Sequence, residues 1–181
     1  IKTMHDVPFI PGVYLKKLID LMEDENLPVK HIGRECGIDF SAINFGAFVS
    51  NNQIQALMRH YLKLTSEQNP GVCYGLKLDA LTHGFLGYIY MFRGKPFELI
   101  KHVIGYMNVR IPTLKMGMVI EQDYVAIQFN AELLPDDLKT FVLQSYIASV
   151  YKLGAMILPK LQVYASRQLF NSTACLNTIF H

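Results

Sequence analysis

Charged residues are scarce in this chain of 181 residues: they make up 18% of it, whereas hydrophobic residues make up 51%. This composition excludes a disordered chain, which needs low hydrophobicity and high net charge. The formal net charge is only +2, and the longest basic run is the pair Lys16 and Lys17. Proteins that bind nucleic acid gather basic residues on one face, because neutralising phosphates dominates their affinity. The composition therefore gives no support for direct contact with DNA.

Cysteine and histidine are also few and widely spaced. The three cysteines stand at positions 36, 73 and 175, and the six histidines form neither an HxH nor an HExxH motif. A zinc site needs such ligands clustered on one element or on two neighbouring ones, so we predict no metal site. The cysteines are best explained as reduced, buried thiols of a cytoplasmic protein.

Motifs for nucleotide binding and hydrolysis are missing as well. The sequence holds no GxGxxG, no GxxxxGK[ST] and no GxSxG, and its acids lie in surface-like positions that select no catalytic pair. We therefore expect no enzymatic activity, no catalytic residue and no cofactor. One near match to a haem motif exists. The segment YASR at 164–167 resembles the Tyr-x-Ser-x-Arg signature by which haem nitric-oxide-binding domains hold the haem propionates, but its arginine comes one residue early.

Only one long hydrophobic run occurs, at residues 141–158. It carries a single charge, Lys152, but it includes Gln144, Ser145 and Ser149 and is marginal against the roughly 20 apolar residues that a membrane span needs. The N-terminal stretch also lacks the long apolar core of a signal peptide. We predict a central buried or interface helix, no membrane association and a cytoplasmic location.

Hydrophobic periodicity predicts an α+β fold in a single domain of residues 1–181, with helices packed on a small antiparallel sheet and a long C-terminal apolar helix. Apolar residues at helical spacing predict helices over 13–27, from Ser50 or Asn51 to the NPG at 69–71, over 96–107 and over 136–158. Alternation with period two predicts a hairpin over 113–131, turning at 122–123. Residues 161–165 suit one more strand, residues 85–92 suit a helix or a strand equally, and the tail 166–181 shows no clear pattern.

The segment HIGRECGIDFSAI at 31–43 has the rhythm of a helix-turn-helix, with a short helix, a glycine and a second short helix. The second helix, however, offers no Lys or Arg for phosphates or guanine edges, and Asp39 would face a phosphate-rich groove. We predict that this segment is scaffold and does not read DNA.

Several longer pieces, taken in order, resemble a known family. These are GVYLKKLIDLMEDENLPVKHIGRECGID, VSNNQIQALMRHYLKLTSEQNPGVCYGLKL and HGFLGYIYMFRGKPFELIKHVIGYMNVRIP. Over roughly residues 10 to 165 they resemble the N-terminal effector domain, of the arabinose-binding-domain type, of AraC-type transcription regulators. The resemblance implies a cytoplasmic bacterial domain that senses a small-molecule effector or forms a homodimer. DNA recognition would belong to a C-terminal helix-turn-helix domain that is absent from this chain.

The abundance of Met, Phe and Tyr suits a core that surrounds a small molecule, and it suits an ordinary aromatic core equally well. For a ligand pocket we predict the region that joins residues 85–93, the 96–107 helix and the hairpin. Hydroxyls would come from Tyr88, Tyr90 and Tyr106, and Arg93 or Arg110 would pair with a carboxylate. The alternative is that these are core aromatics and solvated charges.

Residues 141–158 are the candidate dimer helix, because an apolar surface on all sides needs cover from its own domain or from a second copy. A different class of function also fits the sequence. The chain would then be a standalone sensor of a small molecule, either a lipid or haem, without a DNA-binding role.

Overall fold

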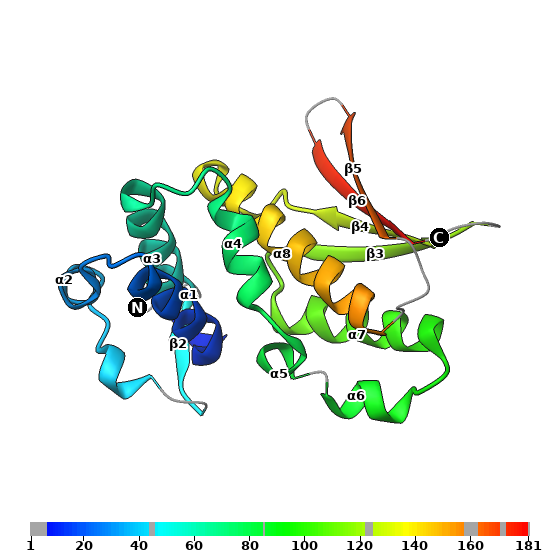
Figure 1. The fold of residues 1–181 in the computed structure, drawn as a ribbon, viewed down its shortest axis with the longest axis horizontal. Helices are drawn as coiled ribbons and strands as arrows, with labels where there is room; N and C mark the ends of the chain where they lie inside the picture. The colour runs from blue at the N-terminus through cyan, green and yellow to red at the C-terminus, as the bar shows by residue number, and fades with distance from the viewer. Residues whose placement is uncertain are drawn as a thin grey trace.

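The computed structural model describes residues 7–43, 46–84, 86–121 and 125–157, together with the backbone of 163–170 and 173–180. Its elements form an α+β fold, as predicted, in which two antiparallel sheets accompany the helices. Figure 1 shows three parts side by side: a group of N-terminal helices, a central pair made of α4 and α8, and a twisted sheet.

The N-terminal group contains α1 (Gly12–Asp24), α2 (Val29–Glu35), a 3-10 turn (Phe40–Ala42) and α3 (Asn51–Leu64). Strands β1 (Pro8–Pro11) and β2 (Phe48–Ser50) pair antiparallel beside these helices, a small sheet that the sequence did not reveal. The segment 31–43 is a pair of short elements, as expected. Asp39 accepts hydrogen bonds from the backbone N–H and the hydroxyl of Ser41, so it stabilises the 3-10 turn itself.

The second part of the chain runs from α4 (Pro70–Lys77) through α5 (Ala80–His83), α6 (Leu86–Met91) and α7 (Pro96–Arg110). The prediction that NPG ends the second long helix is wrong. Helix α3 already ends at Leu64, and Pro70 begins α4, because a proline in the first helical turn loses no hydrogen bond. Residues 85–92, for which the sequence favoured neither a helix nor a strand, contain the helix α6.

The hairpin prediction is confirmed: β3 (Lys115–Ile120) pairs with β4 (Val125–Asn130), and the predicted turn at 122–123 lies outside the described residues. The sheet has the strand order β3-β4-β6-β5, so β6 (Thr173–Phe180) lies between β4 and β5 (Val163–Phe170). The strand suggested at 161–165 is therefore longer, and the tail contributes a further strand. Helix α7 lies along β3.

The long helix α8 (Asp136–Ile157) is confirmed, and its own domain covers most of it. Helix α4 packs along it, and it also contacts β5 and β6. The buried residues on α8 are Leu138, Phe141, Val142, Leu143, Ser145, Tyr146, Ala148, Ser149 and Leu153. This cover from within the domain removes the need for a second copy around α8, and homodimer formation stays a prediction.

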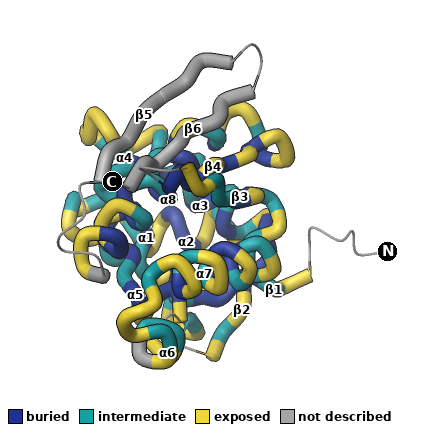
Figure 2. The backbone as a smooth tube through the Cα atoms, turned by 90° about the vertical axis from the view of Figure 1, so that its right-hand side faces the viewer, coloured by how far each residue is buried: buried dark blue, intermediate teal, exposed yellow. Residues whose placement is uncertain are grey.

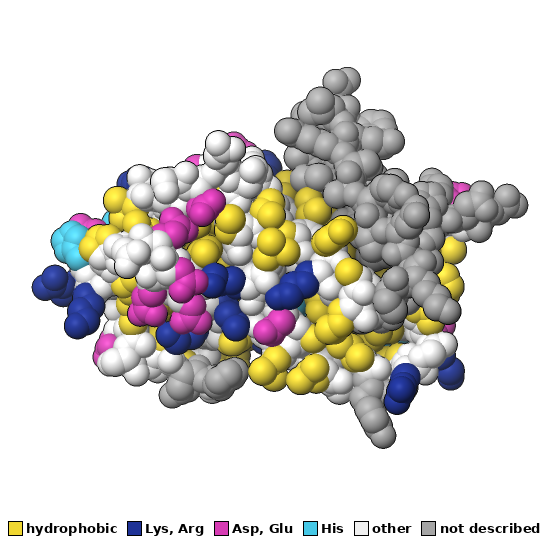
Figure 3. All heavy atoms as spheres, viewed as in Figure 1, with side chains coloured by type: hydrophobic (Ala, Val, Ile, Leu, Met, Phe, Trp, Pro, Cys, Tyr) yellow, Lys and Arg dark blue, Asp and Glu magenta, His cyan; other side chains and the backbone are white. Residues whose placement is uncertain are grey.

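Buried stretches gather in the middle of the molecule, whereas α6 lies at its outer edge (Figure 2). The largest fully buried side chains include Tyr61, Leu15, Leu57, Phe129 and Leu138. They come from the N-terminal helices, the β3–β4 hairpin and α8, so one core joins these three regions. Acidic and basic side chains are interspersed on the face drawn in Figure 3, which shows no continuous basic stripe. Within the described part of the chain, no helix combines the length and the apolar character needed to cross a membrane.

Helix α3 begins with a complete capping box. The Ser50 hydroxyl accepts from the N–H of Gln53 at 3.2 Å, and the Gln53 side chain accepts from the N–H of Ser50 at 3.0 Å. We expect Ser50→Ala to lower the free energy of unfolding by about 1 kcal/mol, because one helix-end donor loses its partner. Urea unfolding measures this loss. Ser66→Ala, at an exposed residue beyond the end of α3, is the control and is expected to stay within about 0.5 kcal/mol. Equal losses would contradict the cap.

Candidate ligand-binding site

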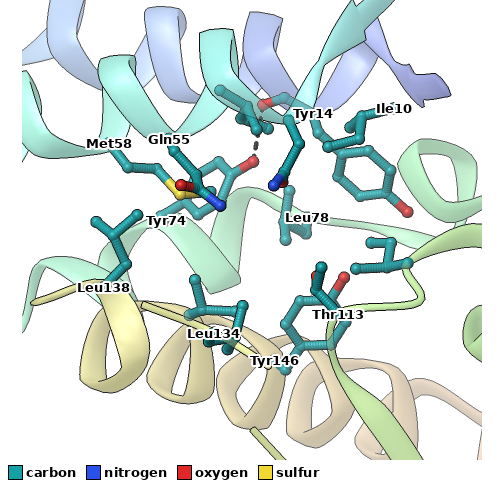
Figure 4. Close-up of a pocket in the computed structure, with 14 residues that line it drawn as sticks. Ile10, Tyr14, Gln55, Met58, Tyr74, Leu78, Thr113, Leu134, Leu138 and Tyr146 are labelled. Carbon is teal, nitrogen blue, oxygen red and sulfur yellow. Dashed lines mark hydrogen bonds between the residues drawn. The ribbon is translucent and has the colours of Figure 1, made fainter. Parts of the chain in front are cut away.

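A cavity of about 60 Å³ lies where the N-terminal helices meet α4 and α8. Most of its lining is apolar, with a few polar groups among the side chains (Figure 4). The lining residues are Ile10, Tyr14, Asn51, Ile54, Gln55, Met58, Tyr74, Leu78, Ile111, Thr113, Leu134, Leu138, Val142 and Tyr146. An apolar wall with a small number of placed polar groups is the usual composition of a small-molecule site.

The amphipathic faces of the helices bring these residues together. Tyr14 lies on the buried face of α1, Ile54 on that of α3, and Val142 and Tyr146 lie one turn apart on α8. Across the cavity, the Tyr74 hydroxyl on α4 donates to the backbone carbonyl of Tyr14 at 2.8 Å, which is the dashed bond in Figure 4. This bond joins α4 to α1 and fixes one wall of the cavity.

The Tyr14 hydroxyl points away from that bond, into a buried polar cluster. It lies 3.0 Å from Nδ1 of His83, and Nε2 of His83 lies 2.7 Å from Oγ of Ser149. His83 is 2% exposed, and burial, followed by the positive charge of Arg110, lowers its pKa to about 4. A neutral ring satisfies both bonds when Nδ1 accepts from Tyr14 and Nε2–H donates to Ser149. The cluster thus ties α1, α5 and α8 together.

Arg110, the last residue of α7, lies beside this cluster. Its guanidinium carbon is 5.5 Å from the ring centre of Tyr14 and 5.4 Å from that of Tyr106, and its Nη1 donates to the Tyr106 hydroxyl at 2.5 Å. Burial raises the pKa of the Tyr14 hydroxyl to about 12, although the positive charge of Arg110 and a hydrogen bond from it partly offset this effect. Two of the predicted site residues, Tyr106 and Arg110, are therefore in direct contact.

The other predicted site residues are less close to the cavity. Tyr88 packs edge-to-face on Tyr106 with ring centres 5.6 Å apart, and Arg93 is exposed in the turn before α7. Tyr90 is on α6, but its side chain lies outside the described residues. Tyr88, Arg93, Tyr106 and Arg110, whose side chains the structure describes, are not among the residues that line the cavity, so the role of the predicted residues in ligand binding stays a prediction.

Sequence reasoning missed Tyr14, Tyr74, Tyr146 and His83. The tyrosines carry the same periodic signal as ordinary core residues, and His83 belongs to no motif. Only one local signal marks this region: Asp79 begins α5 by accepting from the N–H of Thr82 at 2.7 Å, and Gly84 ends it with a φ of +78°. These caps position His83 but do not reveal what it contacts.

Among solved structures, the chain shares its fold with H-NOX domains. It matches the crystal structure of an oxygen-binding H-NOX domain related to soluble guanylate cyclases, in its oxygen complex, with a TM-score of 0.59 and 11% identity over 93% of this chain and 90% of that one. It also matches an H-NOX protein from S. oneidensis in the Fe(II)NO ligation state, with a TM-score of 0.57 and 9% identity over 95% and 99% of the two chains. No protein-family model and no curated protein matches the sequence.

These comparisons correct the expected family. The prediction of an AraC-type effector domain is wrong, because the solved structures that share the fold over more than nine-tenths of the chain are H-NOX domains. The ordered pieces that carried the resemblance do form helices here, but their three-dimensional arrangement is that of the H-NOX fold. The expectation of a partner DNA-binding domain rested on that resemblance and is withdrawn with it. The YASR segment lies on β5, whose side chains are outside the described residues.

Proposed function

We propose that this chain is a standalone, non-enzymatic sensor domain that binds a small organic molecule in the cavity between α1, α3, α4 and α8. The observation that carries the proposal is the cavity itself: a mostly apolar wall that also includes the polar residues Asn51, Gln55, Thr113 and Tyr146. The fold supports a sensing role, because the H-NOX domains that it resembles were solved with oxygen and with nitric oxide on iron.

A haem in this cavity is not supported by the residues present. A haem iron needs an axial His, Cys, Met or Tyr ligand, and a cofactor pocket is typically several hundred Å³ in volume. No described histidine or cysteine lines the cavity; Met58 and the tyrosines Tyr14, Tyr74 and Tyr146 do, but they enclose only about 60 Å³. Both nitrogens of His83 are engaged by Tyr14 and Ser149, and His102 is exposed on α7 and does not line this cavity. We therefore propose that this cavity binds an organic ligand rather than a haem.

The size of the cavity gives the proposed sensor its mechanism. At about 60 Å³ it is well below the ~150 Å³ of an engineered cavity that holds benzene. An organic ligand therefore needs the lining elements to move apart. The N-terminal helices and the α4–α8 pair meet at the cavity, so binding favours an arrangement in which these two groups are further separated. A ligand shifts this equilibrium by its differential affinity for the two arrangements.

Filling the cavity tests the proposal. We expect Val142→Leu to raise the free energy of unfolding by up to about 0.8 kcal/mol, because one added methylene is buried in existing space. The same variant is expected to lose most of the rise in Tm that small organic compounds give the wild type. The measurement is thermal unfolding with and without 3-phenylpropanoate, 3-phenylpropanamide, decanoate and decanol.

The matched control is Val150→Leu, which makes the same change two turns further along α8, at a residue that does not line the cavity. This variant is expected to keep the ligand-dependent rise in Tm. An equal rise in all three proteins would show that binding occurs elsewhere, and no rise in the wild type would contradict the proposed function.

A further inference from the structure

We infer that the ligand of this cavity is an organic acid with an apolar body, whose carboxylate is held by Arg110 beside Tyr14 and Tyr146. This inference rests on the proposed function and names its ligand class. It comes from a cation that the described part of the chain leaves without an acidic partner, next to the end of the cavity where these two tyrosines lie.

Arg110 lacks a counter-charge within the described residues. The ion pairs there involve other cations, and no carboxylate oxygen lies within 4.0 Å of its guanidinium. Its Nε is buried and has no hydrogen-bond partner in that part of the chain. A buried donor without a partner is unfavourable, and more so when it is charged, so the site favours a ligand that accepts from it.

The groups around Arg110 are neutral donors and aromatic rings. Its guanidinium contacts the rings of Tyr14 and Tyr106, and its charge also acts on His83 and Tyr146. The one acid that acts on His83 is Asp79, which already caps α5 and lies 4.0 Å from Lys17. A carboxylate entering this cluster meets a planar fork of donors without a competing negative charge.

The cluster adjoins the cavity through Tyr14, which belongs to both. Tyr146 and Ile111, the residue after Arg110, also line the cavity. In Figure 4 the hydroxyls of Tyr14 and Tyr146 lie on the same side, beyond the apolar residues Leu78, Leu134 and Leu138. A ligand of matching shape is therefore charged at one end and apolar along the rest.

Two pairs of probes with the same tail separate charge from shape: 3-phenylpropanoate against 3-phenylpropanamide, and decanoate against decanol. Calorimetric titration of the wild type is expected to show each acid binding about 10- to 100-fold more tightly than its neutral partner, the range for a hydrogen bond to a charged group. Arg110→Met should remove this preference and leave the affinity for the neutral compounds unchanged. Arg110→Lys should retain part of it, because lysine keeps the charge without the fork.

Arg34→Met is the matched control, because Arg34 is an exposed arginine on α2 that does not line the cavity, and it should leave all four affinities unchanged. If the acids and their neutral partners bind equally, the acid preference is wrong while the sensor function stands. If no probe binds, both are wrong. If Arg110→Met fails to fold, the acid preference of the wild type and its reduction in Arg110→Lys still decide the inference. Loss of all binding in Arg110→Met would instead show that Arg110 only supports the structure.

Discussion

Gly75→Ala is expected to lower the free energy of unfolding by about 3 kcal/mol, the upper part of the range for an overpacked core. Gly71 and Gly75 lie one turn apart on α4 and let its backbone approach α8 closely. A Cβ at Gly75 would lie 2.2 Å from the carbonyl oxygen of Ser145 and 2.8 Å from Cβ of Ala148. Backbone cannot rotate away as a flexible side chain can, so the two helices must separate. Urea denaturation of the purified chain measures the loss.

Gly105→Ala is the matched control. Gly105 lies inside α7, and a Cβ there would have no atom within 4 Å. The same substitution is therefore expected to stabilise the protein by roughly 0.5–1 kcal/mol, because alanine loses less backbone freedom on folding than glycine does. A Gly75→Ala variant as stable as the wild type would contradict the close contact between α4 and α8.

Acidification from pH 7.5 to pH 4.5 is expected to remove about 2.5 kcal/mol of stability through His83 alone. Burial holds the pKa of His83 at about 4 in the folded protein, against 6.5 in the unfolded chain. Above pH 6.5 the ring is neutral in both states, and the stabilisation is fully present. As the pH falls from 6.5 towards 4, the unfolded chain takes up a proton that the folded chain does not, so the folded state loses stability.

Comparing variants isolates this contribution, because carboxylates such as Asp137, whose pKa is lowered by Arg59, also lose stability in acid. His83→Gln removes the titrating ring and should flatten the slope between pH 6.5 and pH 4.5 relative to the wild type. His102→Gln changes an exposed histidine and should leave the slope as it is. Urea midpoints across this pH range provide the measurement. Equal slopes in the wild type and His83→Gln would mean that His83 is not buried as a neutral ring.

Local chemistry explains which elements were predicted and which were missed. Neighbouring residues determine the N-cap of α3 at Ser50 and the start of α7 at Pro96. They also determine the alternation in β3 and β4. The NPG segment misled because a proline permits both the end of one helix and the beginning of the next. Strand β6 was missed because its residues show no clear alternation. It pairs locally with β5, where Phe170 lies opposite Thr173, and over a long distance with β4, where Val125 lies opposite Phe180.

The predicted family failed for a related reason. The resemblance rested on ordered helical segments, and such an order does not fix how the segments pack. The arrangement in space, which the solved H-NOX structures share at 8–11% identity, decided the fold. An α+β fold with a long apolar helix was nevertheless predictable, since hydrophobic periodicity alone indicates which residues a helix or strand must bury.

The sequence by itself determined the helical stretches and the hairpin, and it offered Arg110 as one of two candidate arginines for a ligand carboxylate. Only the tertiary structure decided what surrounds that arginine. Tyr14 and His83 are 69 residues apart in the chain, and His83 and Ser149 are 66 apart. Such contacts arise when α1, α5, α7 and α8 pack together, and no pattern among neighbouring residues encodes them. The candidate site is therefore a product of packing between elements that periodicity predicts only one at a time.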